Sequence, residues 1–307
     1  MKKTLVIGST VVDVIIGVDK LPTTQEDTHT TSHKMSLGGC AYNVSEIFRQ
    51  SKTPYLLASP VGSGAYGEYV EKKLTEKNIP IFVKTPEIEN GCCYCFVEES
   101  GERTFISHHG AEYLFSKEWF SNLDLSDFDS VYICGLEIEE KTGENLVSWL
   151  EENAYYNLQI FFAPGPRLTK IDKKLINRIF KLNPIIHLNE KEAFEFSGEN
   201  EIEKAAKYIS LKTKNSVIIT LGEKGCLSFD ISKNQCDIIP VFKNKLFPQV
   251  VDTIGAGDSH IGALICSLKR SKTLKEATEI ANIISSAVVG ISGANLSDSD
   301  FNRLNQF

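Results

Sequence analysis

The sequence lacks several features by which broad classes of protein are recognised. No stretch approaches the ~20 consecutive apolar residues that a helix needs to cross a bilayer, so no membrane partner is expected. Positive charge is not in excess: the formal net charge is -7, which disfavours nucleic acid and anionic lipid as partners. Repeats, low-complexity tracts and linkers are also absent, and 307 residues suffice for one large domain.

The first residues imitate a secretory signal, because two lysines precede an apolar run. Gly8, Ser9 and Asp13 interrupt that run, and no small-residue cleavage site follows it. We therefore expect a buried β-strand here and a cytoplasmic protein.

The 8 cysteines do not suggest a metal centre or a disulfide framework. The one cluster, Cys92, Cys93 and Cys95, has no second pair at zinc-site spacing and alternates as a strand does. Reduced, mostly buried thiols are the expectation.

Apolar strand-like runs alternate with amphipathic helices along most of the chain. This alternation predicts an α/β fold: a three-layer sandwich whose mostly parallel central sheet is flanked by helices. Two stretches break the alternation, since residues 17–37 are polar and residues 91–109 are typical of a hairpin with its turn at 99–101. We expect residues 1–307 to form a single domain with a small β-flap, a discontinuous lid at roughly 14–37 and 91–109.

The segment Asp252–Ala263, DTIGAGDSHIGA, carries the clearest chemical pattern. A strand-like piece at 248–251 precedes it and an apolar helix follows. Glycines at 255 and 257 let successive N–H groups point one way, at a helix N-terminus where the dipole favours negative charge. Asp258 would be held ionised there and could accept a hydroxyl proton. Taken alone, the segment is equally typical of a glycine turn with Asp258 as a helix N-cap.

This segment resembles the second signature of the ribokinase-like (PfkB) carbohydrate kinases, D-T-x-G-A-G-D-x-F-x-G-A. The first signature, a double glycine followed by Asn at the head of a helix, is matched at Gly38, Gly39 and Asn43. The resemblance extends from about residue 4 to residue 300. It implies a ribokinase-like fold and ATP-dependent phosphorylation of an alcohol group on a small sugar, under a flap that excludes water.

The resemblance also implies a role for each matching residue. Asp258 would be the general base, beside an anion hole formed by Gly255, Ala256 and Gly257. Substrate hydroxyls would be bound by Asp13, Gly38, Gly39, Asn43 and Glu137. The nucleotide would be bound by Asn189, Thr220, Gly222, Gly225 and Asn282. Glu192 would hold Mg²⁺ through water, and Asp252 and Ser297 would contribute to a monovalent-cation (K⁺) site.

Three positions depart from the family pattern, and they concern mainly the substrate. Cys40 stands where ribokinases proper usually carry Lys, and Gly64 replaces an Asp. His260 stands where the family usually has Phe, and we interpret it as a core residue or a pocket wall.

Several alternatives stay open or are set aside. Residues 62–67 fit G-x-G-x-x-G, but a dehydrogenase explains none of the later motifs, and the absence of a Walker A sequence excludes the usual P-loop kinases. A nucleoside kinase of the same fold is the main alternative, with Tyr42 and the strand at 92–96 available to stack a base. A non-catalytic binding protein is the third hypothesis, and an exposed strand edge could support a homodimer.

Overall fold

The computed structural model describes residues 1–304, which fall into two compact units. The larger unit comprises Met1–Ile7, Asn43–Leu56 and the segment from Phe115 onward, and the smaller comprises Gly8–Tyr42 and Leu57–Leu114. Within the described residues no helix is both long and apolar enough to cross a membrane.

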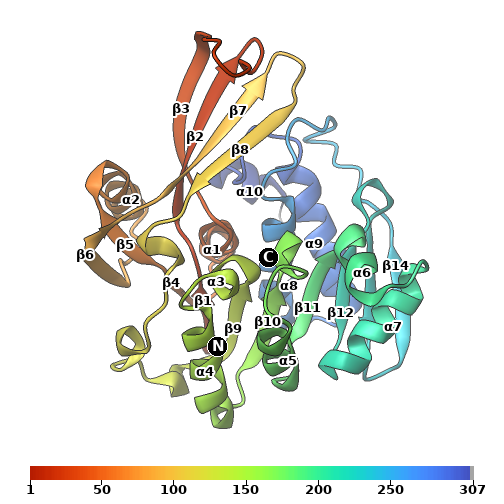
Figure 1. Cartoon of the computed structure of the whole chain (residues 1–307). Helices are drawn as coiled ribbons and strands as arrows, with labels where there is room; N and C mark the ends of the chain where they lie inside the picture. Colours follow the sequence, from red (N-terminus) through yellow and green to blue (C-terminus); the bar gives the residue numbers. More distant parts are fainter. Residues whose placement is uncertain (305–307) are drawn as a thin grey trace. The chain divides into compact units, whose positions relative to one another are not determined.

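The larger unit is built on an eight-stranded sheet of order β14-β13-β12-β11-β10-β9-β1-β4 (Figure 1). The pairs from β1 through β9, β10 and β11 to β12 are parallel, and β13 and β14 extend the edge in antiparallel pairing. The strands are β1 Lys3–Ile7, β4 Tyr55–Ala58, β9 Phe128–Cys134, β10 Gln159–Ala163, β11 Ile185–Asn189, β12 Val217–Thr220, β13 Cys226–Asp230 and β14 Gln235–Ile239.

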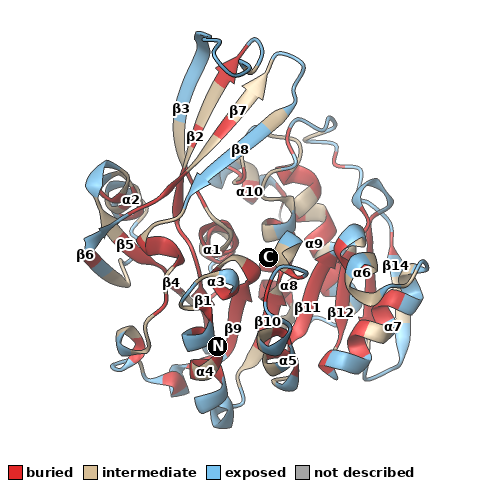
Figure 2. Cartoon of the chain, viewed as in Figure 1, coloured by how far each residue is buried: buried red, intermediate tan, exposed pale blue. Residues whose placement is uncertain are grey.

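Helices flank this sheet, and the parallel strands are buried along nearly their whole length (Figure 2). Burial on both faces is the reason these strands read as continuous apolar runs in the sequence. The helices are α1 Cys40–Gln50, α3 Gly135–Glu139, α4 Gly143–Glu152, α5 Lys173–Lys181, α6 Glu190–Ser197, α7 Ile202–Thr213, α8 Ala256–Lys269, α9 Leu274–Val288 and α10 Asp298–Leu304. The predicted α/β fold with a mostly parallel central sheet is confirmed.

The smaller unit contains a four-stranded sheet of order β3-β2-β7-β8 and a separate pair, β5 and β6. Its elements are β2 Val11–Val18, β3 Thr30–Gly38, β5 Pro60–Ser63, α2 Gly64–Glu76, β6 Val83–Glu89, β7 Cys92–Glu98 and β8 Arg103–His108. The hairpin expected at 91–109 is the antiparallel pair β7 and β8. The role of this sheet as a lid stays a prediction.

Short 3₁₀ helices complete the description: Ala111–Tyr113, Lys117–Phe120, Leu125–Asp127, Ala154–Tyr156, Gly165–Arg167 and Gly222–Lys224.

One local prediction is wrong: residues 248–251 form no strand. Val250 and Val251 are 73% and 54% exposed, so they do not belong to the core. The N–H groups of Val251 and Asp252 both donate to the carbonyl of Val289, just beyond the last residue of α9. The backbone therefore pairs with a helix end instead of joining the sheet.

Candidate active site

The N-terminus of α8 has the geometry that the sequence predicts for an anion-binding turn. Gly255 is the N-cap residue with φ 74°, and a Cβ there would lie 2.6 Å from the Cβ of Ala294. Both the left-handed backbone and the lack of space therefore require glycine. The N–H of Ser259 donates to the carbonyl of Gly255, so the N–H groups of Gly257 and Asp258 precede the first intrahelical bond. The positive end of the helix dipole lies at these groups.

Asp258 lies in the first turn of α8, half-buried, and α1 supplies its partner. The amide nitrogen of Asn43 donates to Oδ2 of Asp258 at 2.8 Å. Asn295 in turn donates its amide N–H to Oδ1 of Asn43 at 2.9 Å, which fixes the orientation of the Asn43 amide. Two donors, the Asn43 amide and the helix N-terminus, thus favour the ionised form of the carboxylate that a general base requires.

Close packing of two helices positions the Asn43–Asp258 pair. Gly262 lies one turn beyond Asp258 on α8, and Ile47 lies one turn beyond Asn43 on α1. A Cβ at Gly262 would come within 3.1 Å of the Cβ of Ile47, a contact tighter than side chains normally make. The glycine of the sequence pattern is therefore explained by helix–helix contact.

Asp252 joins the start of this segment to the turn that carries Asn295. Its side chain is almost fully buried, with Oδ1 accepting from the N–H of Ile254 and Oδ2 from the N–H of Gly293, both at 3.0 Å. The hydroxyl of Ser297 is exposed and bonds Asp300 at the start of α10. These contacts give both side chains a structural role, and their part in a K⁺ site stays a prediction.

The N-x-x-E motif forms a capping box at the start of α6. Oδ1 of Asn189 accepts from the N–H of Glu192 at 2.8 Å, and Oε2 of Glu192 accepts from the N–H of Asn189 at 3.0 Å. Burial raises the pKa of Glu192, against the opposing effect of the bonds from Asn189. The reciprocal bonds hold the carboxylate in one place, which suits a group that binds Mg²⁺ through water. The spacing alone could have indicated this cap.

The predicted nucleotide loop begins at Thr220, which lies in register with Asn189 on the adjacent strand. Gly222 and Gly225 have φ 59° and 102°, in the left-handed region that favours glycine. A Cβ at Gly225 would lie 2.1 Å from the carbonyl oxygen of Ile239. The loop is thus packed directly against the end of β14.

Asn282, predicted to line the nucleotide site, belongs to a buried chain of side chains. Its amide nitrogen donates to the carbonyls of Ile239 and Pro240 at 3.2 and 3.1 Å. Its Oδ1 faces Nε2 of His260 at 3.2 Å, and Nδ1 of His260 faces Nε2 of His187 at 3.0 Å. The structure therefore places His260 in the core. No sequence signal pairs it with His187, which is 73 residues away.

The buried histidines predict a specific dependence of stability on pH. Burial lowers the pKa of His260 to about 4 and that of His187 well below its usual value. Between the unfolded pKa of about 6.5 and these values, the unfolded chain binds protons that the folded chain does not. The contribution of these neutral histidines to the free energy of unfolding is thus fully present above about pH 6.5 and decreases as the pH falls. For His260 alone the decrease is about 2 kcal/mol at pH 5.

Urea unfolding at pH 7 and pH 5 checks this expectation. His260→Phe removes one of the two titrating groups, so its stability should fall less than that of the wild type between these pH values. An equal fall in the two proteins would contradict the assignment.

In the smaller unit, Asp13 on β2 lies directly against Gly38 at the end of β3. A Cβ at Gly38 would come 2.0 Å from Oδ2 of Asp13, and a Cβ at Gly39 would come 2.5 Å from the carbonyl oxygen of Ser9. Gly38 therefore makes room for the carboxylate, and Gly39 makes room for the backbone of Ser9. Cys93 is in register with Asp13 on β7, and burial, reinforced by Asp13, raises the pKa of its thiol.

Glu137 lies on the short helix α3, immediately after β9, and is only 2% exposed. The thiol of Cys134 donates to its Oε2. The structure thus places this predicted substrate residue at the carboxyl end of a central strand, where α/β sheets commonly bind ligands.

The G-x-G-x-x-G stretch has a structural explanation in the smaller unit. Its strand, β5, pairs only with β6 among the described residues and is not part of the central sheet. A Cβ at Gly67 would lie 2.1 Å from the carbonyl oxygen of Gly62, so the glycines pack α2 against its own strand. This arrangement is not the dinucleotide-binding unit.

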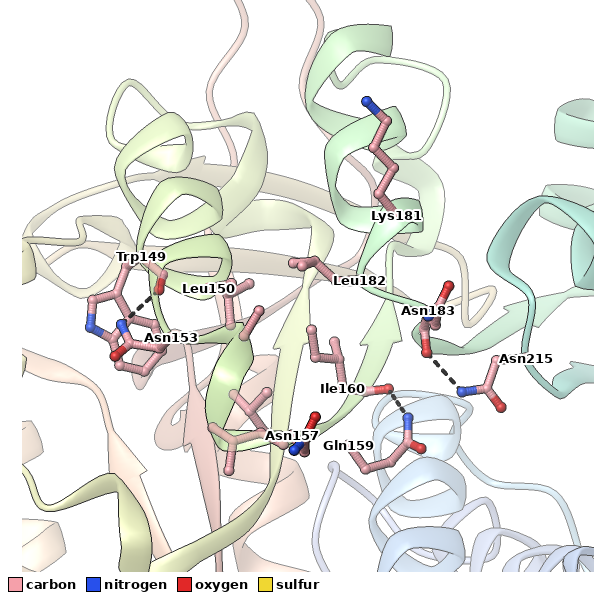
Figure 3. Close-up of a pocket in the computed structure, with 13 residues that line it drawn as sticks. Trp149, Leu150, Asn153, Asn157, Gln159, Ile160, Lys181, Leu182, Asn183 and Asn215 are labelled. Atoms are coloured by element: carbon pink, nitrogen blue, oxygen red, sulfur yellow. Dashed lines mark hydrogen bonds between the residues drawn. The ribbon is translucent and has the colours of Figure 1, made fainter.

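A cavity of about 340 Å³ lies at the other end of the central strands, near the start of β10 (Figure 3). Part of its polar lining is engaged: Asn153 donates to the carbonyl of Trp149, and Asn215 to that of Asn183. Asn157 and Asn183 adopt left-handed backbone conformations that favour asparagine in turns.

Among the described residues, no cluster of His, Cys, Asp or Glu could hold a metal ion by side chains alone.

Comparisons with known proteins agree with this fold. The sequence model for "pfkB family carbohydrate kinase" matches residues 1–300. The chain is 32% identical over 294 residues to "Uncharacterized sugar kinase YegV" of Escherichia coli (strain K12), covering 94% of this chain and 89% of that protein. Ribokinase from Giardia lamblia has a TM-score of 0.83 at 21% identity, with 99% of each chain covered. Burkholderia thailandensis nucleoside kinase in complex with inosine has a TM-score of 0.76 at 17% identity, covering 98% of this chain and 97% of that one.

The chain belongs to the pfkB family of carbohydrate kinases. As a member of this family it is an ATP-dependent phosphotransferase.

Proposed function

We propose that the protein transfers the γ-phosphoryl group of MgATP to an alcohol group of a small sugar, with Asp258 as the general base. The hydrogen bond from Asn43 to Asp258, at the N-terminus of α8, is the observation that carries this proposal. A carboxylate held in this position, beside N–H groups that can receive negative charge, supports the proposed role.

In this mechanism the sugar hydroxyl gives its proton to Asp258 as its oxygen attacks the γ-phosphorus. The new O–P bond forms while the bond from phosphorus to the bridging oxygen of ADP breaks, and ADP leaves. Negative charge on the transferring group is stabilised by the N–H groups of the turn at 255–258 and by the dipole of α8.

Binding residues follow the family pattern. Asp13 would accept hydrogen bonds from sugar hydroxyls, and the loop at 220–225 would bind the nucleotide phosphates. Bound Mg²⁺ would neutralise phosphate charge, and the fixed, buried carboxylate of Glu192 fits a role of holding one of its water molecules. We assign the monovalent-cation site to Asp252 and Ser297, whose side chains also make internal bonds.

The nucleoside alternative receives less support from the aromatic side chains. Tyr42, a candidate to stack a base, is buried, and the amino group of Lys77 lies 5.9 Å from its ring centroid. The hydroxyl of Tyr94 on β7 bonds that of Tyr66 at 2.9 Å. The buried ring of Tyr42 thus offers no open face to a base, which favours a sugar over a nucleoside.

A panel of phosphoryl acceptors distinguishes a sugar kinase from a nucleoside kinase. ADP release is measured with matched monosaccharides and nucleosides at equal concentration. We expect kcat/KM for at least one monosaccharide to exceed that for every nucleoside by about 100-fold, since a site that hydrogen-bonds its substrate discriminates strongly. The reverse order would establish a nucleoside kinase.

A further inference from the structure

A continuous chain of hydrogen bonds crosses the core of the larger unit from β11 to α8 and α9. It runs from His187 through His260 to Asn282, with contacts of 3.0 and 3.2 Å. These side chains are at most 6% exposed. The family pattern places an apolar phenylalanine at the middle position, so the polar chain is a property of this sequence.

The two carbonyls that accept from Asn282 determine which nitrogen of each histidine carries a hydrogen. The carbonyls of Ile239 and Pro240 can only accept, so the amide nitrogen of Asn282 must face them and its Oδ1 must face His260. Nε2 of His260 therefore carries the hydrogen. Because burial keeps the ring neutral, its Nδ1 is an acceptor, and Nε2 of His187 must donate to it. Each group therefore donates to the next one, from His187 through His260 and Asn282 to the carbonyls.

This chain of hydrogen bonds ends at the backbone of residues 239–240, against which the predicted nucleotide loop at 220–225 packs. The carbonyl of Ile239 accepts from Asn282 and would also be the first atom met by a Cβ on Gly225. Both N–H groups of the Asn282 amide are used, and its Oδ1 is occupied by His260. Asn282 therefore contributes to this region by holding the backbone at 239–240, and its amide has no donor left for a ligand.

We propose that His260 is a positioning residue for the nucleotide: it locks the Asn282 amide in one orientation, and that amide holds residues 239–240 against the loop at 220–225. This inference rests on the proposed nucleotide role of that loop. A phenylalanine at position 260 would fill the space but would leave Oδ1 of Asn282 and Nε2 of His187 buried without a partner. The Asn282 amide would then lose its fixed orientation.

Two variants of His260 test the proposal by steady-state kinetics. His260→Phe should raise the KM for ATP about tenfold, the value of one hydrogen bond of average strength, while kcat and the KM for the sugar change less than about twofold. His260→Gln should restore the KM for ATP, because its carbonyl can accept from His187 and its amide can donate to Asn282. A merely structural role would lower the active fraction, and thus kcat, with both KM values unchanged.

Asn282→Leu supplies the matched second variant. It should reproduce the raised KM for ATP, and the double variant with His260→Phe should be no worse than either single change, since both break the same bond. An unchanged KM for ATP in His260→Phe, or additive effects in the double variant, would overturn the proposal.

Two measurements keep this test separate from the proposed reaction. Equilibrium binding of ADP needs no acceptor, so a wild type that binds ADP but phosphorylates nothing would refute the proposed function alone. In ¹⁵N NMR of labelled histidines, both rings should be neutral with the hydrogen on Nε2. A hydrogen on Nδ1 of His260 would refute the inference alone.

Discussion

Replacing Asp258 with asparagine is expected to lower kcat by at least about 10²-fold while the protein stays folded, because it removes the general base. Asparagine keeps the size of the side chain and can still bond Asn43, but its amide cannot take the proton of the attacking hydroxyl. The measurement is kcat at saturating ATP and sugar, with unfolding by urea as the check on stability.

Asp172→Asn is the matched control, since Asp172 also lies at a helix N-terminus, where it caps α5 by accepting from the N–H of Lys174. Asparagine caps helices about as well as aspartate, so this variant should retain wild-type kcat. If Asp258→Asn turned over at a nearly normal rate, Asp258 would be a helix-capping residue and not the base.

The substitution Gly38→Ala is expected to raise the KM for the sugar by about 10- to 100-fold, equivalent to losing one charge-assisted hydrogen bond. A methyl group at position 38 would lie 2.0 Å from Oδ2 of Asp13, so the carboxylate must move. The backbone of Gly38 does not need a positive φ, so the fold should tolerate the change. KM for sugar and KM for ATP are measured together, and only the first should rise.

The control for this variant is Gly101→Ala in the turn between β7 and β8 of the same sheet. A Cβ there meets no atom within 4 Å in the part of the chain that the structure describes, but φ is 87°, so the variant should lose stability without changing either KM. Asp13→Asn should reproduce the effect of Gly38→Ala. An unchanged KM for the sugar in both variants would remove Asp13 from the binding site.

The sequence predicted most of the fold because the fold depends on local patterns. Parallel strands buried on both faces leave continuous apolar runs, and helices leave an amphipathic period. The glycine turn before Asp258 was predictable for the same reason, since φ 74° at Gly255 restricts the residue type. The strand expected at 248–251 is wrong because two apolar residues in a row do not show whether a neighbouring strand is available to pair with them.

Contacts between distant residues account for what the sequence did not predict. Asn295 bonds Asn43 across 252 positions, and His260 bonds His187 across 73, so no local pattern marks either pair. From the sequence, His260 could be recognised only as a polar residue where the family usually has phenylalanine, and its bonding partners could not be predicted. The use of the whole Asn282 amide inside the core follows only from three-dimensional contacts.

The most direct test of the account is ³¹P NMR of the products formed from ATP, Mg²⁺ and the best sugar of the panel. We predict that a phosphate monoester of the sugar appears in the same amount as ADP, with no inorganic phosphate, and that Asp258→Asn forms it at least about 10²-fold more slowly. Release of inorganic phosphate without a sugar monoester, or equal rates in the two proteins, would contradict the account.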